Sequence, residues 1–174
     1  VGTGAMAAIL VLDASVVKTV CDAVAAETGA VVSPANFNDP KQTVIAGAKA
    51  AVDVACEKLK AAGAKRALPL AVSAPFHCAL MKPAAERLRE RLASIPIATP
   101  RIAVINNVDV AVQTDAGAIR DALFRQAFGP VRWVEVVHAL AGRGLTHIFE
   151  CGPGKVLAGL ARRIDGSLAS GTVL

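Results

Sequence analysis

An α/β fold is predicted by the order in which short apolar runs and longer amphipathic runs follow one another in this sequence. Across residues 4–72, strand-like runs of β-branched and aliphatic residues alternate with helix-like runs that are apolar on one face. Glycines such as Gly29 and Gly63 stand where the helix-like runs end. The resulting order is β-α-β-β-α-β, which is the ferredoxin-like arrangement of two split βαβ units on one antiparallel sheet.

The elements of this first subdomain follow from local signals along the chain. The apolar run at 6–12 is too short for a helix and predicts a strand, after which Asp13 or Ser15 can cap a helix. Residues 36–40 read Asn-Phe-Asn-Asp-Pro, which is typical of a turn. The other elements expected here are helices over 16–27 and 49–62, and strands from 31, over 42–46 and over 66–72.

The second part of the chain, residues 73–165, is expected to contain several helices and two short strands. The helices expected are 82–95, 115–128, 134–141 and 155–164, and the strands are 101–108 and 147–151. Two short strands do not form a stable parallel sheet alone, so either they pair with the first sheet or their partner strands are missing. We expect a fragment with missing strands upstream of Val1, since no initiator methionine is present, and a frayed tail from Asp165.

The composition excludes some classes of function and leaves others open. Aromatic residues make up 3% of the chain, which gives nucleic-acid recognition by base stacking little to use. Charges, glycines and prolines interrupt every apolar run before the roughly 20 residues of a membrane helix, so we expect neither nucleic acid nor membrane as a partner. The net charge of +5 is scattered, which suits a solvated face, an acidic protein partner or a phosphate-bearing ligand.

The cysteines predict a reducing compartment and no metal centre. The four of them are widely spaced, form no Cys-x-x-Cys pair and follow no signal peptide. We therefore expect a cytoplasmic protein. No set of histidine, cysteine and carboxylate residues has the spacing of metal ligands, so no bound metal is predicted.

His77 is the histidine whose position suggests chemistry, because it lies on a turn between a predicted strand and a predicted helix. The alternative, that it is an ordinary loop histidine, is equally compatible with its position. A general base needs a nucleophile; Ser73 and Cys78 are close in sequence, but both are badly placed to approach the imidazole. No Gly-x-Ser-x-Gly elbow occurs in the chain. The other histidines, His138 and His147, are expected to be structural.

Several stretches, taken together, resemble the malonyl-CoA:acyl carrier protein transacylases of type II fatty acid synthesis, in the order and spacing of that family. The matching stretches are residues 2–8, 32–38, 63–70, 73–83, 106–109, 125–126 with 130–133, and 150–157. The resemblance implies an α/β-hydrolase-like acyltransferase domain into which a ferredoxin-like small subdomain is inserted. By this match residues 4–72 form the small subdomain, and residues 73–165 form the C-terminal portion of the large one.

The resemblance also implies a reaction. Members of the family transfer a malonyl group from malonyl-CoA to the phosphopantetheine thiol of acyl carrier protein, through an ester on the serine of a Gly-His-Ser-x-Gly elbow. His77 matches the family's catalytic histidine, and Gln126 matches the residue whose backbone carbonyl orients it. The family works as a monomer and uses no cofactor beyond the coenzyme A thioester that is its substrate.

The resemblance has gaps that bear on activity and selectivity. The elbow serine, the arginine that pairs with the malonyl carboxylate and the glutamine of the oxyanion hole lie in segments that this chain lacks, so we expect no transfer by the chain alone. Phe76 stands where related acyltransferases have a phenylalanine with malonyl selectivity and a serine with methylmalonyl selectivity, which predicts malonyl. Asn36 and Asn38 either line the cleft between the subdomains or only shape the turn.

Two other functions remain compatible with these residues. One is the acyltransferase domain of a polyketide synthase, which shares the fold; the short motifs favour the discrete enzyme. The other belongs to a different class, a non-catalytic module that binds carrier protein or another acidic partner through its basic residues.

Overall fold

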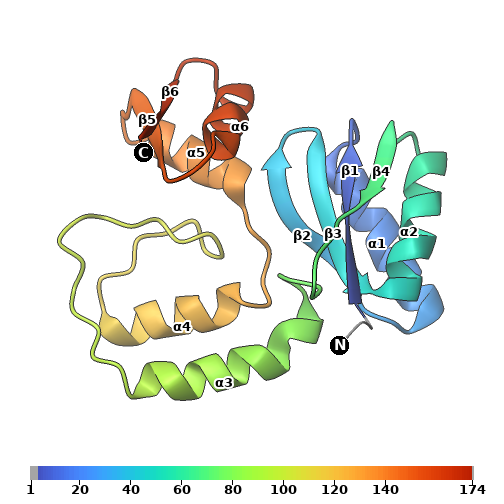
Figure 1. The fold of residues 1–174 in the computed structure, drawn as a ribbon, viewed down its shortest axis with the longest axis horizontal. Helices are drawn as coiled ribbons and strands as arrows, with labels where there is room; N and C mark the ends of the chain where they lie inside the picture. The colour runs from blue at the N-terminus through green and yellow to red at the C-terminus, as the bar shows by residue number, and fades with distance from the viewer. Residues whose placement is uncertain (1–3, 174) are drawn as a thin grey trace.

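The computed structural model describes residues 4–173 and shows an α/β protein that begins with a four-stranded antiparallel sheet (Figure 1). The strands are β1 (Gly4–Leu10), β2 (Val32–Asp39), β3 (Gln42–Ala48) and β4 (Arg66–Pro69), in the spatial order β2-β3-β1-β4. The helices α1 (Ala14–Thr28) and α2 (Lys49–Ala61) cover one face of this sheet. The predicted ferredoxin-like order is therefore confirmed.

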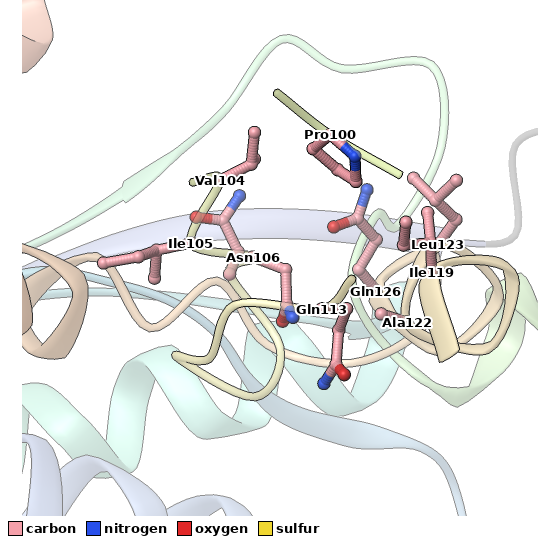
Figure 2. Close-up of a pocket in the computed structure, with 10 residues that line it drawn as sticks. Pro100, Val104, Ile105, Asn106, Gln113, Ile119, Ala122, Leu123 and Gln126 are labelled. Carbon is pink, nitrogen blue, oxygen red and sulfur yellow. The ribbon is translucent and has the colours of Figure 1, made fainter. Parts of the chain in front are cut away.

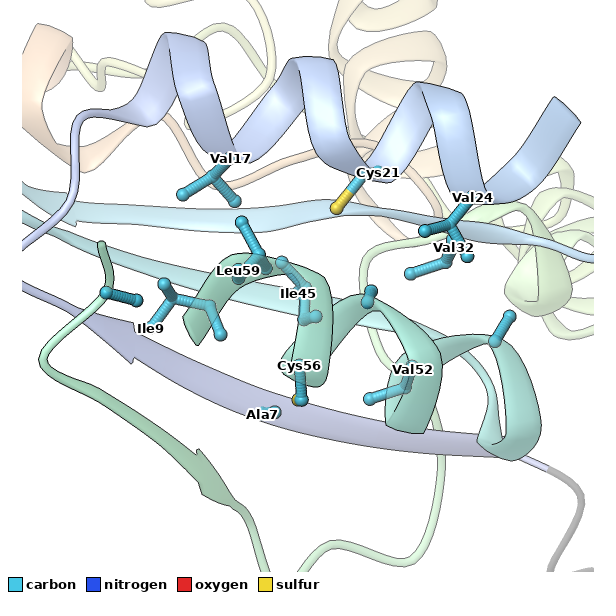
Figure 3. Close-up of a cluster of buried hydrophobic side chains, with 13 residues drawn as sticks. Ala7, Ile9, Val17, Cys21, Val24, Val32, Ile45, Val52, Cys56 and Leu59 are labelled. Atoms are coloured by element: carbon cyan, nitrogen blue, oxygen red, sulfur yellow. The ribbon is translucent and has the colours of Figure 1, made fainter. Parts of the chain in front are cut away.

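The sheet buries apolar side chains on both of its faces. Ile9, Ile45 and Leu59 are fully buried in the cluster between the sheet and its two helices (Figure 3). Alternate residues of the same strands, such as Met6 and Val44, form a second cluster on the opposite face, as the period of a strand requires. The second cluster includes Cys78, so the turn after β4 covers this face.

The strand bounds differ from the sequence-based expectation: β1 spans Gly4–Leu10 rather than residues 6–12, and larger differences occur in β2 and β4. Residues 36–40 were expected to be a turn, but β2 continues to Asp39, and the turn is confined to Pro40 and Lys41. The register of β2 against β3 shifts twice in this strand, and such bulges let an edge strand with turn-like residues continue to pair. β4 ends at Pro69 rather than residue 72, and the Leu70 amide makes one further bond to β1, to the Met6 carbonyl at 2.9 Å.

The second part contains helices, one short 3₁₀ turn and a separate pair of strands. These elements are η1 (Ala79–Met81), α3 (Lys82–Ala93), α4 (Ala116–Gln126), α5 (Trp133–Ala141), β5 (His147–Cys151), α6 (Val156–Ile164) and β6 (Ala169–Val173). The side chain of Asp115 caps α4 by accepting a hydrogen bond from the Ala118 amide at 3.0 Å. Helices α3 and α4 lie side by side, and Arg120 of α4 donates to the carbonyls of Leu92 and Ile95 (Figure 1).

Two expectations for the second part were wrong. Residues 101–108 do not form a strand: they are an irregular loop with one bridge between Ile105 and Val112, and Ile102 is 81% exposed. The tail after Asp165 is not frayed, since β6 pairs in parallel with β5. Apolar residues alone do not make a strand when no neighbouring strand is available for pairing. None of the helices in residues 4–173 is both long and apolar enough to cross a bilayer.

Candidate active site

The turn that carries His77 is anchored to the sheet by its neighbours in sequence. Cys78 is 1% exposed in the second apolar cluster, and its Sγ donates to the Pro75 carbonyl at 3.1 Å. Gly4, at the start of β1, packs so closely against Pro75 that a Cβ there would overlap the proline ring. The backbone on both sides of His77 is therefore held against the sheet.

His77 itself has a strained backbone. Its φ is 59°, in the left-handed region that residues with a Cβ seldom adopt. Such a conformation costs of order 1–3 kcal/mol and is maintained only where the surrounding structure determines it. Here the buried Cys78 and the contact of Pro75 with Gly4 supply that determination. The consequence is a fixed direction for the Cα–Cβ bond that carries the imidazole.

Two backbone carbonyls hold the imidazole of His77 by the same nitrogen. Nδ1 lies 3.0 Å from the Gln126 carbonyl oxygen and 3.2 Å from the Gly129 carbonyl oxygen. Both partners are acceptors only, so Nδ1 must carry the proton that it shares between them. In the neutral ring Nε2 then has a free lone pair, which is the state that a general base requires.

The acceptor carbonyls come from the end of α4, where the geometry of a helix terminus leaves carbonyls unpaired within the helix. Gln126 is the last residue of α4, and Gly129 follows before Pro130. The structure thus brings His77 and Gln126 together, as the family resemblance implies. Sequence reasoning missed Gly129; the signal was Pro130, which has no N–H and forces the preceding residue into extended conformations that expose its carbonyl.

The remaining predicted residues surround this pair without bonding to it. Phe76 precedes His77 and is 40% exposed. Asn36 and Asn38 are half-buried on β2 and not in a turn, so of the two alternatives the one in which they only shape a turn is excluded. Asn36 pairs with Val44 and therefore faces the side of the sheet on which Cys78 packs. In the part of the chain that the structure describes, neither asparagine hydrogen-bonds to His77.

The edge strand β2 is tied directly to the segment that follows Gly129. The Phe37 amide donates to the Val131 carbonyl at 2.9 Å, and the Val131 amide donates to the Ala35 carbonyl at 2.8 Å. These two bonds join the first subdomain to the acceptor segment. They place β2, and with it Asn36, beside the residues that hold the imidazole.

A cavity of about 340 Å³ lies beside Gln126, between α4 and the loop before it (Figure 2). Its lining combines apolar side chains with four side-chain amides. The lining residues are Pro100, Val104, Ile105, Asn106, Asn107, Gln113, Ile119, Ala122, Leu123 and Gln126. Gln126 therefore contacts both His77 and the cavity: its carbonyl accepts from the imidazole, while its side chain borders the cavity. The sequence did not predict this cavity, because its walls are 20 or so residues apart in the chain.

The described residues near His77 do not supply a nucleophile. Burial raises the pKa of the Cys78 thiol, and its sulfur is directed to Pro75 rather than to the imidazole. Within residues 4–173 no group of three or more histidine, cysteine, aspartate and glutamate side chains could hold a metal ion. Chemically, the imidazole in this arrangement can accept and return a proton at Nε2.

His77 is thus held by two backbone carbonyls and lies beside the ferredoxin-like sheet. Residues 1–149 match the family model described as the acyl transferase domain. The chain therefore belongs to the acyl transferase domain family.

Within that family the chain is similar to malonyl transacylases. It is 54% identical over 169 residues to the malonyl CoA-acyl carrier protein transacylase of Salmonella typhimurium, covering 97% of this chain and 54% of that protein. The structure of the acyl-carrier-protein S-malonyltransferase from Burkholderia pseudomallei 1710b is 58% identical, with a TM-score of 0.95 and coverage of 99% and 55%. A malonyl-transacylase in complex with its type II PKS acyl-carrier protein is 52% identical, with a TM-score of 0.96 and coverage of 99% and 55%. The chain thus spans about half the length of these relatives.

Proposed function

We propose that this chain supplies the general base of an enzyme that transfers a malonyl group from malonyl-CoA to the phosphopantetheine thiol of acyl carrier protein. The observation that carries the proposal is the pair of carbonyls on His77 Nδ1, at 3.0 and 3.2 Å, which leaves Nε2 as the base. The names of the similar proteins support the choice of malonyl-CoA and acyl carrier protein as substrates.

The chemistry assigned to His77 is proton transfer in both halves of the reaction. Nε2 takes the proton of a serine hydroxyl as the oxygen attacks the thioester carbonyl, and the imidazolium returns it to the departing coenzyme A thiolate. In the second half Nε2 takes the proton of the phosphopantetheine thiol, whose sulfur attacks the serine ester. The proton then returns to the serine oxygen. Neutral carbonyls fix the tautomer but stabilise the imidazolium less than a carboxylate would.

The serine and the groups that bind the malonyl carboxylate are proposed to come from a segment outside residues 1–174. The relatives are about twice as long as this chain, which leaves room for that segment. No cofactor is needed in this scheme, since coenzyme A enters and leaves as part of the substrate. We also propose that the complete enzyme acts as a monomer in the cytoplasm.

Phe76 is proposed to select malonyl over methylmalonyl. It is adjacent to the base, and its partly exposed ring is large enough to occupy the space of an α-methyl group. Asn36 and Asn38 are proposed to border the acyl cleft from β2. In the complete enzyme, Phe76→Ser should raise the rate with methylmalonyl-CoA relative to malonyl-CoA; an unchanged ratio would refute this assignment.

The experiment joins this chain to the N-terminal half of the Salmonella typhimurium relative and measures malonyl transfer to acyl carrier protein. His77→Asn should lower kcat by about 10²–10⁴-fold, the usual worth of general base catalysis. His138→Asn changes an exposed histidine on α5 and is the matched control. The chain alone should give no transfer. Full activity of His77→Asn, or transfer by the chain alone, would contradict the proposal.

A second candidate function is the same malonyl transfer in polyketide synthesis instead of fatty acid synthesis. The complex of a malonyl-transacylase with a type II PKS carrier protein favours service to a polyketide synthase as an alternative. Rates of the joined enzyme with carrier proteins of both pathways separate the two: a preference for the fatty acid carrier supports the first candidate. A non-catalytic carrier-binding module would bind without forming an acyl-serine, and its binding would weaken in moderate salt.

A further inference from the structure

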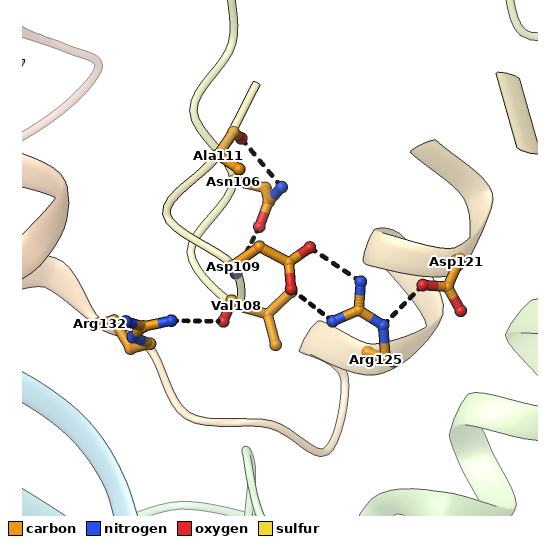
Figure 4. Close-up of polar contacts among 7 residues, drawn as sticks. All are labelled: Asn106, Val108, Asp109, Ala111, Asp121, Arg125 and Arg132. Carbon is orange, nitrogen blue, oxygen red and sulfur yellow. Dashed lines mark hydrogen bonds and ion pairs between the residues drawn. The ribbon is translucent and has the colours of Figure 1, made fainter. Parts of the chain in front are cut away.

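Two arginines flank, along the chain, the residues whose carbonyls accept from His77, and both arginines bind the same loop. Arg125 directly precedes Gln126, and Arg132 follows Pro130. Both donate hydrogen bonds to the loop 106–111 (Figure 4). The segment that carries the two acceptor carbonyls is therefore clamped at both ends by side chains that play no part in the chemistry described above.

The first clamp is a bidentate ion pair. Arg125 donates through its two terminal nitrogens to Asp109, at 2.5 and 2.8 Å, while its Nε donates to Asp121 at 2.6 Å. The Arg125 and Asp109 side chains are 35% and 25% exposed, so water screens this pair less than it would an open surface pair. The guanidinium holds the pKa of the Asp109 carboxyl below its usual range, which keeps the pair charged. The Arg125 side chain is thus held by two carboxylates, Asp109 from the loop and Asp121 from its own helix.

The second clamp comes from the other end of the segment. Arg132 donates from its side chain to the Val108 carbonyl at 3.3 Å and from its amide to the Asn107 carbonyl at 3.2 Å. Between the clamps, Gly129 lies so close to the loop that a Cβ on it would be 2.9 Å from Val108 Cγ2. The loop therefore contacts the backbone of one acceptor residue directly and the flanks of both.

The loop is able to act as a rigid support because it is closed on itself. The Asn106 side chain accepts from the Asp109 amide at 2.7 Å and donates to the Ala111 carbonyl at 3.0 Å. Backbone bonds between Asn106 and Ala111 and between Val110 and Asn106 complete the closure. Val110 is held at a φ of 58°, a strained value for a β-branched residue that shows how firmly the loop is determined.

We propose that Arg125 and Asp109 are positioning residues: their ion pair sets the place of the Gln126 and Gly129 carbonyls, and so holds His77 in the tautomer with its proton on Nδ1. The proposal rests on the proposed role of His77 as the base. It predicts that breaking the pair changes the imidazole, which touches neither residue. A pair that only stabilises the fold would leave the tautomer of His77 unchanged in the folded state.

The first experiment uses the 174-residue chain labelled with nitrogen-15 and measures the tautomer of His77 by NMR at about pH 9, where imidazoles are neutral. His77→Asn assigns the signal. Asp109→Asn and Arg125→Gln should each lower the ratio of Nδ1–H to Nε2–H by about threefold or more, and the double variant should lower it no further than either single one. Arg125→Lys keeps the positive charge but loses the bidentate contact, so its ratio should lie between those of the parent chain and Arg125→Gln.

The matched control is Asp53→Asn, which breaks the exposed ion pair of Lys49 with Asp53 on α2 and should leave the ratio unchanged. Circular dichroism checks that each variant is folded; if Asp109→Asn is not, the milder Arg125→Lys decides. A ratio in folded Asp109→Asn or Arg125→Lys that equals that of the parent chain would overturn the proposal.

The second experiment separates this proposal from the function on which it rests. In the joined enzyme, Asp109→Asn should lower kcat about tenfold with KM within about twofold, as expected for a misplaced base. If His77→Asn abolishes transfer while Asp109→Asn keeps the parent kcat, only the positioning role fails. If His77→Asn keeps full transfer, the proposed function itself fails, whatever the tautomer ratio shows.

Discussion

Residues 4–69 and residues 79–173 reach an ordered structure by different means. The first region has a sheet with apolar clusters on both faces, and its largest buried side chains, Ile9, Ile45 and Leu59, are fully excluded from water. The second region leaves large apolar side chains exposed, among them Ile102 at 81% and Val156 at 70%. What it has in place of a large core is a set of polar attachments, including the ion pair of Arg125 with Asp109. The first region has its own hydrophobic core, as an independent domain does, whereas the second exposes large apolar side chains of the kind found at interfaces.

This comparison explains where the candidate base is placed. His77 lies on the turn between the two regions, with its backbone anchored on the sheet of the first through Cys78 and its imidazole held by carbonyls of the second. The apolar core of the first region anchors the turn, and the hydrogen bonds from the second region orient the imidazole of His77. A change in either region should therefore reach His77 by a different route.

The largest expected difference in the free energy of unfolding comes from truncating one leucine in each region. Leu59→Ala, in α2, should lower the free energy of unfolding by about 3 kcal/mol, since Leu59 is fully buried. Leu157→Ala, in α6, is the matched control, because Leu157 is 42% exposed and should change stability by less than about 0.5 kcal/mol. Urea unfolding of both variants measures the two values. Equal losses would show that Leu157 is packed as closely as Leu59.

Two glycine-to-alanine changes should have opposite signs. A Cβ on Gly47 in β3 would overlap the backbone of Val31 and Val32, so Gly47→Ala should cost about 2 kcal/mol. Gly159 lies within α6 and has open space around it, so Gly159→Ala should stabilise by about 1 kcal/mol through helix propensity. Thermal unfolding gives both signs. A destabilised Gly159→Ala would mean that the second region is as tightly packed as the sheet.

Acid should loosen the second region before the first. The Arg125 guanidinium lowers the pKa of Asp109, so the stabilisation is fully present above about pH 4, the ordinary aspartate value, and is lost as the pH falls through the lower folded value. Amide hydrogen exchange in the loop 106–111 should accelerate over that range, ahead of exchange in β1 and β3. In Asp109→Asn this step should be missing; its persistence there would assign it to another carboxylate.

The smallest expected effect concerns thiol accessibility. Cys151 is exposed on β5, so Ellman's reagent should label it in the native protein. Cys21 is buried beneath the sheet, and burial raises its pKa to about 12, which makes it unreactive at neutral pH. Cys151→Ser should abolish native labelling and leave three thiols that react only on unfolding. Fast labelling of Cys21 would show that the first region opens more easily than its core suggests.

The sequence predicted the first region better than the second. Local signals located the helices α1 and α2 and the strands β1 and β3, because each has an apolar face with the right period and a clear end. The pattern failed at Asn36–Asp39, where turn-type residues continue β2 through two register shifts, and at residues 101–108, where an apolar run has no strand beside it. In both places pairing with a neighbour, rather than local preference, decided the outcome.

What the sequence determined by itself was the ferredoxin-like order of elements, the position of His77 on a turn, and the family to which its motifs belong. These depend on residue type and spacing along the chain. Only the tertiary structure decided that Gly129 shares Nδ1 with Gln126, that Val110 and His77 have left-handed backbones, and that β6 pairs with β5. The shared Nδ1 of His77 and the pairing of β6 with β5 depend on residues distant in sequence meeting in space, and the φ of Val110 depends on hydrogen bonds within its own loop. Neither kind of contact leaves a periodic trace in the chain.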